Sequence, residues 1–217
     1  MAASPELVLC YGDSNTFGQS GAAFARLPFE SRWTTALQAV LGGSYTVVAE
    51  GLNGRTTVLD DGVGSEAMLL PEALNGRRYL LPCLHSHKPI AVVVLALGCN
   101  DLKDKHYHGP FNVVAGVRTL VADIRKSAAG PAAGAAPRVV VVSPPLLRET
   151  ALNRDWGFNH CAERSRATID AMAVACEQDG LAFVDLSAAA SVGADGIHFE
   201  AEAGAPIAAA VAKAVLG

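Results

Sequence analysis

Hydrophobic residues along the chain gather into five short runs, separated by longer segments of helical composition. The runs are Leu7–Tyr11, Tyr45–Glu50, Ile90–Leu97, Arg138–Ser143 and Leu181–Asp185. The third and fourth runs show no polar alternation, which indicates strands that are covered on both faces. This pattern predicts parallel strands joined by crossover helices.

The segments between the strands predict five helices: Ser31–Leu41, Glu66–Leu84, Pro110–Ala129, Asn159–Asp179 and Glu202–Leu216. Pro110 suits a first helical position, Asn159 or His160 can cap the fourth helix, and Gly180 suits the end of that helix. Together these elements predict an α/β fold, a three-layer α/β/α sandwich around a flavodoxin-like five-stranded parallel sheet. Without a repeat or a linker, we expect one domain over residues 1–217, with a surface loop at 127–137.

The composition of the chain excludes several classes of protein. Hydrophobic residues make up 51% and charged residues 18%, which predicts a packed core. A net charge of -4 without a basic run argues against a nucleic-acid partner, and the longest apolar run is too short to cross a membrane. The five cysteines are odd in number and lack Cys-x-x-Cys spacing, so we expect reduced thiols. With no signal-peptide pattern, these features predict a cytoplasmic protein.

The ends of the predicted strands carry the candidate chemistry. In open parallel sheets, ligands bind beyond the carboxyl ends of the strands. Strands one, two and three run into Gly12–Thr16, Gly51–Thr57 and Gly98–Asp101, and Asp195–Phe199 precedes the last helix. Each segment alone is also ordinary turn composition. Their occurrence at one end of one sheet favours a functional site.

Together these segments hold the parts needed for acyl transfer. The Ser14 hydroxyl becomes nucleophilic when His198 removes its proton, and Asp195 can orient the other ring nitrogen of His198. The backbone N–H groups of Ser14 and Gly54 and the side-chain amide of Asn100 can donate to a developing oxyanion. The sequence therefore predicts a catalytic triad of Ser14, Asp195 and His198, with Ser14, Gly54 and Asn100 as the oxyanion hole.

These motifs resemble the four blocks of the GDSL or SGNH hydrolases, and the resemblance covers the whole chain. Wider stretches resemble short bacterial aryl esterases, among them Arg32-Trp33, residues 50–57 and residues 142–145. The resemblance implies the SGNH hydrolase fold, a serine esterase acting on small aryl or alkyl esters, and a homo-oligomer. It implies the same roles for Ser14, Gly54, Asn100, Asp195 and His198, with water or an alcohol as acyl acceptor and without a cofactor or metal.

Asn15 departs from the family, which has Leu at this position. We expect the difference to tune packing rather than chemistry.

Other interpretations stay open at this point. A thioesterase or a carbohydrate acetylesterase would use the same triad, and a catalytically silent flavodoxin-like module could bind a small anion at the strand ends. We expect the loops after strands three and four to form pocket walls with Tyr107, Leu146, Leu147, Trp156 and Phe158. For Trp156 and Phe158, packing in the core or between subunits is the alternative. We interpret the pairs His85/His87 and His106/His108 as exposed loop histidines, and Cys99 as a packed neighbour of the site.

Overall fold

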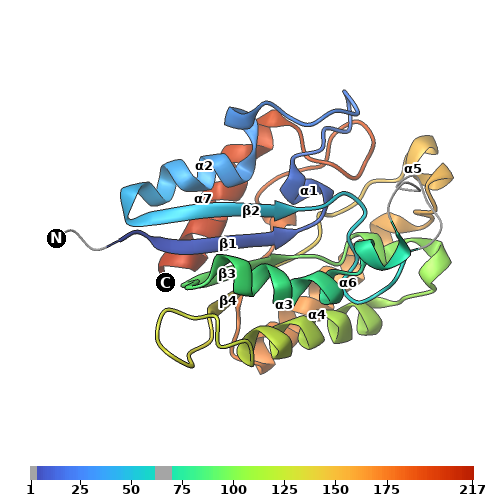
Figure 1. Cartoon of the computed structure of the whole chain (residues 1–217). Coiled ribbons are helices and arrows are strands. Elements are labelled where there is room, and N and C mark those ends of the chain that lie inside the picture. The colour runs from blue at the N-terminus through green and yellow to red at the C-terminus, as the bar shows by residue number, and fades with distance from the viewer. Residues whose placement is uncertain (1–3, 62–69) are drawn as a thin grey trace.

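A five-stranded parallel sheet forms the centre of the protein. The computed structural model describes residues 4–61 and 70–217. The strands follow the order β2-β1-β3-β4-β5 across the sheet, and their arrowheads point to the same side of the molecule (Figure 1). They are β1 (Glu6–Gly12), β2 (Tyr45–Gly51), β3 (Val92–Ala96), β4 (Arg138–Val142) and β5 (Ala182–Val184). This topology confirms the predicted α/β fold and the position of each strand.

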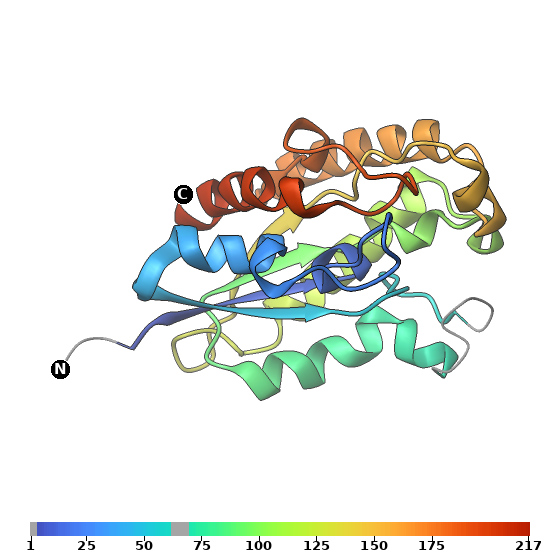
Figure 2. The same cartoon turned by 90° about the horizontal axis from the view of Figure 1, so that it is seen from above.

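Helices cover both faces of the sheet. One face carries α2 (Trp33–Leu41) and α7 (Gly204–Leu216); the other carries α3 (Gly76–His87), α4 (Pro110–Arg125) and α6 (Cys161–Gln178) (Figures 1 and 2). Two short helices, α1 (Ser14–Phe17) and α5 (Ala151–Asp155), lie beyond the carboxyl ends of the strands. Neither was among the five helices predicted between the strands.

Strand residues alternate between two hydrophobic cores. In β1, Val8 and Cys10 pack on the side of α2 and α7, whereas Leu9 and Tyr11 pack on the side of α3, α4 and α6. Both layers need apolar partners, which explains why the inner strands are apolar beyond their first residues, Glu6 in β1 and Arg138 in β4. All five cysteines are buried and unpaired. Among the described residues, no helix is both long and apolar enough to span a membrane.

Three predicted helix starts were too early. Helices α2 and α7 are each preceded by a 3₁₀ turn, Phe29–Ser31 and Ala201–Ala203 respectively. Helix α6 begins at Cys161 because His160 has left-handed backbone with φ 51°, and its side chain makes no capping hydrogen bond. The Asn159 side chain bonds Asp104 instead of capping the helix. Gly180, at φ 62°, does follow the end of α6 as predicted.

Helix α3 was also placed too early, although residues 66–69 of the predicted range lie outside the described residues. It begins after Asn75, whose side chain accepts a hydrogen bond from Arg77 N at 3.0 Å. It continues through Pro82 to His87 and stops at Lys88, which is extended before Pro89. The helix therefore includes His85 and His87, which corrects their interpretation as loop residues. In the next crossover, from β3 to β4, α4 begins with Pro110 as predicted but stops at Arg125.

Candidate active site

Ser14 lies at a tight turn from strand to helix. β1 ends at Gly12, Asp13 caps α1 by accepting a hydrogen bond from Asn15 N at 3.0 Å, and Ser14 is the first residue of that helix. A Cβ atom at Gly12 would lie 2.0 Å from Thr16 Oγ1, so the turn requires glycine. At this first helical position the Ser14 N–H has no acceptor within the helix. Because α1 has only four residues, its dipole adds little to the stabilisation of negative charge.

Ser14, His198 and Asp195 form a continuous hydrogen-bonded chain. His198 Nε2 lies 2.8 Å from Ser14 Oγ, and His198 Nδ1 lies 2.6 Å from Asp195 Oδ2. Asp195 Oδ1 also accepts from the backbone N–H groups of Ile197 and His198, each at 2.9 Å. Burial alone would raise the pKa of Asp195, but these hydrogen bonds outweigh it and lower the pKa below its ordinary value. Asp195 is therefore a carboxylate that can stabilise an imidazolium.

A second set of hydrogen bonds fixes the backbone of the Asp195 turn. The Asp195 carbonyl accepts from Asn153 Nδ2 at 3.0 Å and from Thr150 Oγ1 at 3.1 Å. Thr150 and Asn153 form a capping box at the start of α5. Gly196 packs so closely that a Cβ atom would lie 1.9 Å from Arg148 O. Helix α5, which was not among the predicted elements, thus holds the backbone of Asp195, the predicted acid.

Asn15 makes a different contribution from the one we expected. Its Nδ2 donates to Ile197 O at 3.3 Å, and its Oδ1 accepts from Phe199 N at 3.1 Å. These two backbone groups flank His198. The side chain therefore joins the Ser14 turn to the His198 turn by directed hydrogen bonds, where a leucine would offer only packing. Asn15 thus acts through hydrogen bonds as well as packing, and the expectation that it takes no part in the chemistry stays a prediction.

The Gly54 and Asn100 loops are tied to each other beside Ser14. Asn100 Nδ2 donates one hydrogen to Arg55 O at 3.1 Å, and the same amide nitrogen carries a second hydrogen. Gly54 adopts φ 80°, a left-handed conformation that glycine allows without strain. Beneath them, the buried Asp101 carboxylate accepts from the backbone and hydroxyl of Thr57. Arranged in this way, the two loops can present two donors to one oxygen atom.

Buried acids lie next to this arrangement. Burial raises the pKa of Asp13 to about 6, against the opposing effects of the Asn15 N–H and His198. Burial also raises the pKa of Asp101, although its bonds from Thr57 act in the other direction. The pKa of Cys99 is raised well above its ordinary value by burial, so this thiol is a poor nucleophile. Cys99 packs in a hydrophobic cluster with Leu147 and Phe158.

A cavity of about 310 Å³ opens beside Ser14 and His198. Its lining includes Trp156 and Phe158 of the predicted walls but not Tyr107, Leu146 or Leu147. Tyr107 comes directly after a 3₁₀ turn, has a left-handed backbone conformation and is 92% exposed. Leu147, in contrast, is buried in the core. Leu146 is half-buried and also lies outside the lining. Further lining residues were not predicted as pocket walls from the sequence: Gln19, Phe24, Asn53, Lys103 and Ile197.

Phe24 is the most informative of the residues that were missed. It is 58% exposed, has φ 50°, and contacts Trp156 edge to face with ring centroids 6.1 Å apart. A nonglycine residue with positive φ is uncommon and costs free energy. Its loop, at 18–27, is held by Glu200, which accepts from Ser20 Oγ at 2.7 Å. No motif marks this loop, because its place at the cavity depends on the contact with Glu200, 180 residues away.

The histidine pairs lie apart from the cavity. Only His85 of the first pair is exposed; it contacts Lys88, while His87 lies 2.8 Å from Glu50. The second pair, His106 and His108, has ring centroids 6.4 Å apart, and His106 faces Asp61. None of these histidines lines the cavity.

Comparisons with known proteins found a matching family and similar solved structures. The GDSL-like lipase/acylhydrolase family matches residues 10–204. A carbohydrate acetylesterase family member from Sinorhizobium meliloti is 33% identical, with 97% of each chain covered and a TM-score of 0.86. The aryl esterase of M. smegmatis is 31% identical, with 97% of this chain and 98% of that chain covered and a TM-score of 0.85. No curated protein matches the chain.

Proposed function

The chain belongs to the GDSL-like lipase/acylhydrolase family and is a carboxylic ester hydrolase, and from this premise we propose that it hydrolyses small acyl esters of aryl alcohols through an acyl-enzyme on Ser14. Because the chain is a hydrolase of this family, the catalytically silent binding module that the sequence left open is rejected. The observation that carries the proposal is the hydrogen-bonded chain from Ser14 through His198 to Asp195, which opens on the cavity.

The proposed reaction begins with attack by Ser14. As Oγ bonds the ester carbonyl carbon, neutral His198 accepts the hydroxyl proton at Nε2, and Asp195 stabilises the resulting imidazolium. The carbonyl oxygen becomes an oxyanion and accepts from Ser14 N, Gly54 N and Asn100 Nδ2. Collapse breaks the bond to the leaving alcohol, which takes the proton from His198.

Deacylation repeats these steps with a second nucleophile. Water, or an alcohol as alternative acceptor, gives its proton to His198 while its oxygen attacks the acyl carbon. Collapse returns the proton to Ser14 and releases the acid or the new ester. Every proton transfer in both halves passes through His198 Nε2, so protonation of free His198 would stop the reaction.

The mouth of the cavity supports an aryl leaving group. Phe24 and Trp156 offer two exposed ring surfaces at right angles, and aromatic pairs of this kind favour edge and face contacts with a further ring. The small volume suits a short acyl chain. We propose acetylated carbohydrate as the second candidate substrate, because Gln19, Asn53 and Lys103 add polar side chains to the same lining.

Two measurements test the proposal. Incubation with a p-nitrophenyl phosphonate should add one phosphonyl group, located on Ser14 by peptide mapping and absent from Ser14→Ala. Phenyl acetate, an acetylated xylose and an acetyl thioester then share one acyl group and differ in the leaving group. The highest kcat/KM should belong to phenyl acetate. Preference for the sugar would support the second candidate, and preference for the thioester would reject both.

Two broader expectations belong to the proposal. Five buried reduced thiols suit the reducing cytoplasm, where we propose that the enzyme works. The homo-oligomer implied by the family resemblance stays a prediction, and light scattering of the purified protein tests it.

A further inference from the structure

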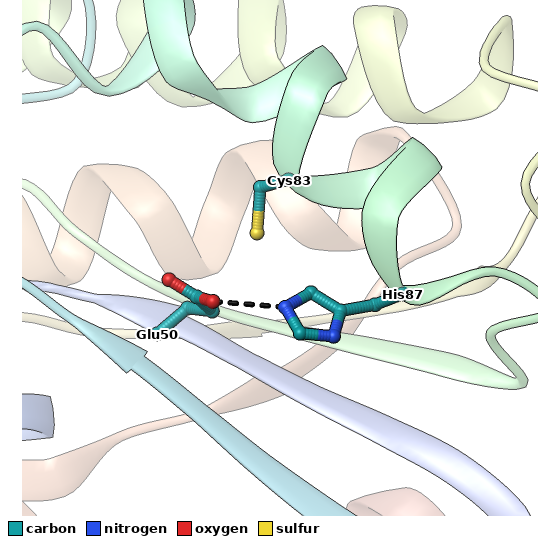
Figure 3. A group of neighbouring side chains, drawn as sticks. All are labelled: Glu50, Cys83 and His87. Carbon is teal, nitrogen blue, oxygen red and sulfur yellow. Dashed lines mark hydrogen bonds and ion pairs between the residues drawn. The ribbon is translucent and has the colours of Figure 1, made fainter.

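Three side chains that can bind metal ions meet between the edge strand β2 and helix α3. Cys83 and His87 lie one helical turn apart on α3, and Glu50 reaches toward them from β2 (Figure 3). Each offers one ligand atom, and the three atoms lie within 4.8 Å of one another. His87 Nε2 and Glu50 Oε1 are 2.8 Å apart.

We propose that Glu50, Cys83 and His87 bind one Zn²⁺ ion, with water as the fourth ligand. A thiolate, an imidazole and a carboxylate are all ligands that Zn²⁺ accepts, whereas Mg²⁺ and Ca²⁺ prefer oxygen alone. Zn–ligand bonds of 2.0–2.3 Å in a tetrahedron put ligand atoms about 3.3–3.7 Å apart. The present atoms lie within 4.8 Å of one another, so side-chain rotation can bring them to that spacing.

The charges balance when the ion binds. The Cys83 thiol loses its proton to solvent as the Zn–S bond forms, because a coordinated thiol is deprotonated. One thiolate, one carboxylate and a doubly charged ion then sum to zero, which avoids burying an uncompensated charge. Arg55 lies near the cluster, but its guanidinium is engaged by the carbonyls of Gly12 and Glu50 and by the ring of Tyr11.

Solvent reaches the proposed site from one side. The side chains of Glu50 and His87 are 23% and 26% exposed, while Cys83 is fully buried behind them. An ion can therefore enter past Glu50 and His87, and water can occupy the fourth position.

The proposed ion lies outside the ester chemistry. None of its three ligands lines the cavity beside Ser14. The ion would instead fasten α3 to the edge strand. We expect it to raise stability and to leave kcat unchanged.

Cobalt substitution tests the site on the whole protein. The protein is stripped with a chelator, the chelator is removed, and Co²⁺ is titrated in. One equivalent should produce thiolate-to-cobalt charge-transfer absorption and the intense visible bands of tetrahedral cobalt, and Zn²⁺ should abolish both. At about a hundredfold excess over its Kd, Zn²⁺ should raise the Tm by roughly 5–10 °C.

Matched variants separate this site from adventitious binding. Cys83→Ser should lose the charge-transfer band, and His87→Gln should weaken binding at least about tenfold. His85→Gln, on the same helix, and Cys176→Ser, a buried thiol on α6, should bind as the wild type does. Since His87 is partly exposed, its variant keeps the test decisive if Cys83→Ser fails to fold. Equal binding by His87→Gln, or absence of a cobalt–thiolate band in the wild type, would overturn the proposal.

Discussion

The floor and the mouth of the cavity are built in different ways. The floor contains Ser14 and Asn100, which line the cavity, are less than 10% exposed and are each held by a hydrogen bond to a neighbouring loop. Asp195 is buried outside the lining, where it bonds the far ring nitrogen of His198. The mouth contains Phe24 and Trp156, which are 58% and 36% exposed and contact each other through their rings. A change in the floor alters groups that the proposed reaction uses directly, whereas a change in the mouth alters a contact with substrate alone.

This difference predicts that changes in the floor lower the rate of reaction, whereas changes in the mouth alter the preference among substrates. Floor groups meet charge that develops in the transition state, so their loss should lower kcat. Mouth groups contact the leaving group equally in ground and transition states, so their loss should raise KM. The following predictions test that division, from the largest expected effect to the smallest.

Ser14→Ala should lower kcat for phenyl acetate by at least about 10³, because no hydroxyl remains to form the acyl-enzyme. Steady-state kinetics measure the loss, and circular dichroism checks that the variant is folded. Substantial turnover by a folded variant would remove Ser14 from the role of nucleophile.

Asn100→Ala should cost about 10²–10³ in kcat, or roughly 2.7–4 kcal/mol, with a smaller change in KM. The lost amide would meet the oxyanion mainly in the transition state. Thr57→Val is the matched control, since it removes a hydrogen bond under the same loop without removing an oxyanion donor. A lower Tm with unchanged kcat in both variants would reduce Asn100 to a structural role.

Asp13→Asn should stabilise the protein as the pH rises. In the folded wild type the pKa of Asp13 is about 6, above the ordinary value of 3.8. Between these pH values the folded state therefore binds more protons than the unfolded state, and the free energy of unfolding of the wild type falls as the pH rises. Asparagine can still accept from Asn15 N but carries no charge. The stability gained by the variant should grow from about pH 4 to pH 6 and then level off, at no more than about 3 kcal/mol.

Urea unfolding of both proteins at several pH values measures this gain. A difference that does not change with pH would contradict the raised pKa of Asp13.

Asn15→Leu should lower kcat about tenfold, because the backbone on both sides of His198 loses a buried partner. The rate of phosphonylation at Ser14 should fall with kcat. Trp33→Phe serves as the control: it removes the indole donor to Asn15 O and leaves the side-chain bridge in place. If both variants lose the same activity, the bridge has no special effect on His198.

Phe24→Ala should raise KM for phenyl acetate several-fold and leave kcat nearly unchanged, in line with the modest free energy of one aromatic pair. Methyl acetate, which lacks a ring, is the control substrate and should show little change. A fall in kcat for both substrates would mean that the mouth also positions the floor.

Part of the site follows from local sequence. Asp195 and His198 are three residues apart, so a single turn brings their side chains together. Asp13 caps the helix that starts at Ser14 through a local hydrogen bond from Asn15 N, two residues away. Because strands alternate with helices and run parallel, their carboxyl ends lie at the same end of the sheet and bring such turns together. The fold and the candidate triad could therefore both be predicted.

Other features required the tertiary structure, because their residues are far apart in the sequence. Phe24 reaches the cavity through a loop held by Glu200, and Asn15 meets Ile197 and Phe199 across 182 and 184 residues. The cluster of Glu50, Cys83 and His87 likewise joins a strand to a helix, where the sequence suggested only a pair of loop histidines. The sequence alone determined the strands, the turns and the chemistry they carry, because these depend on near neighbours. Only the packing of distant segments decided what surrounds that chemistry, because directed hydrogen bonds and ring contacts have no local signature in the chain.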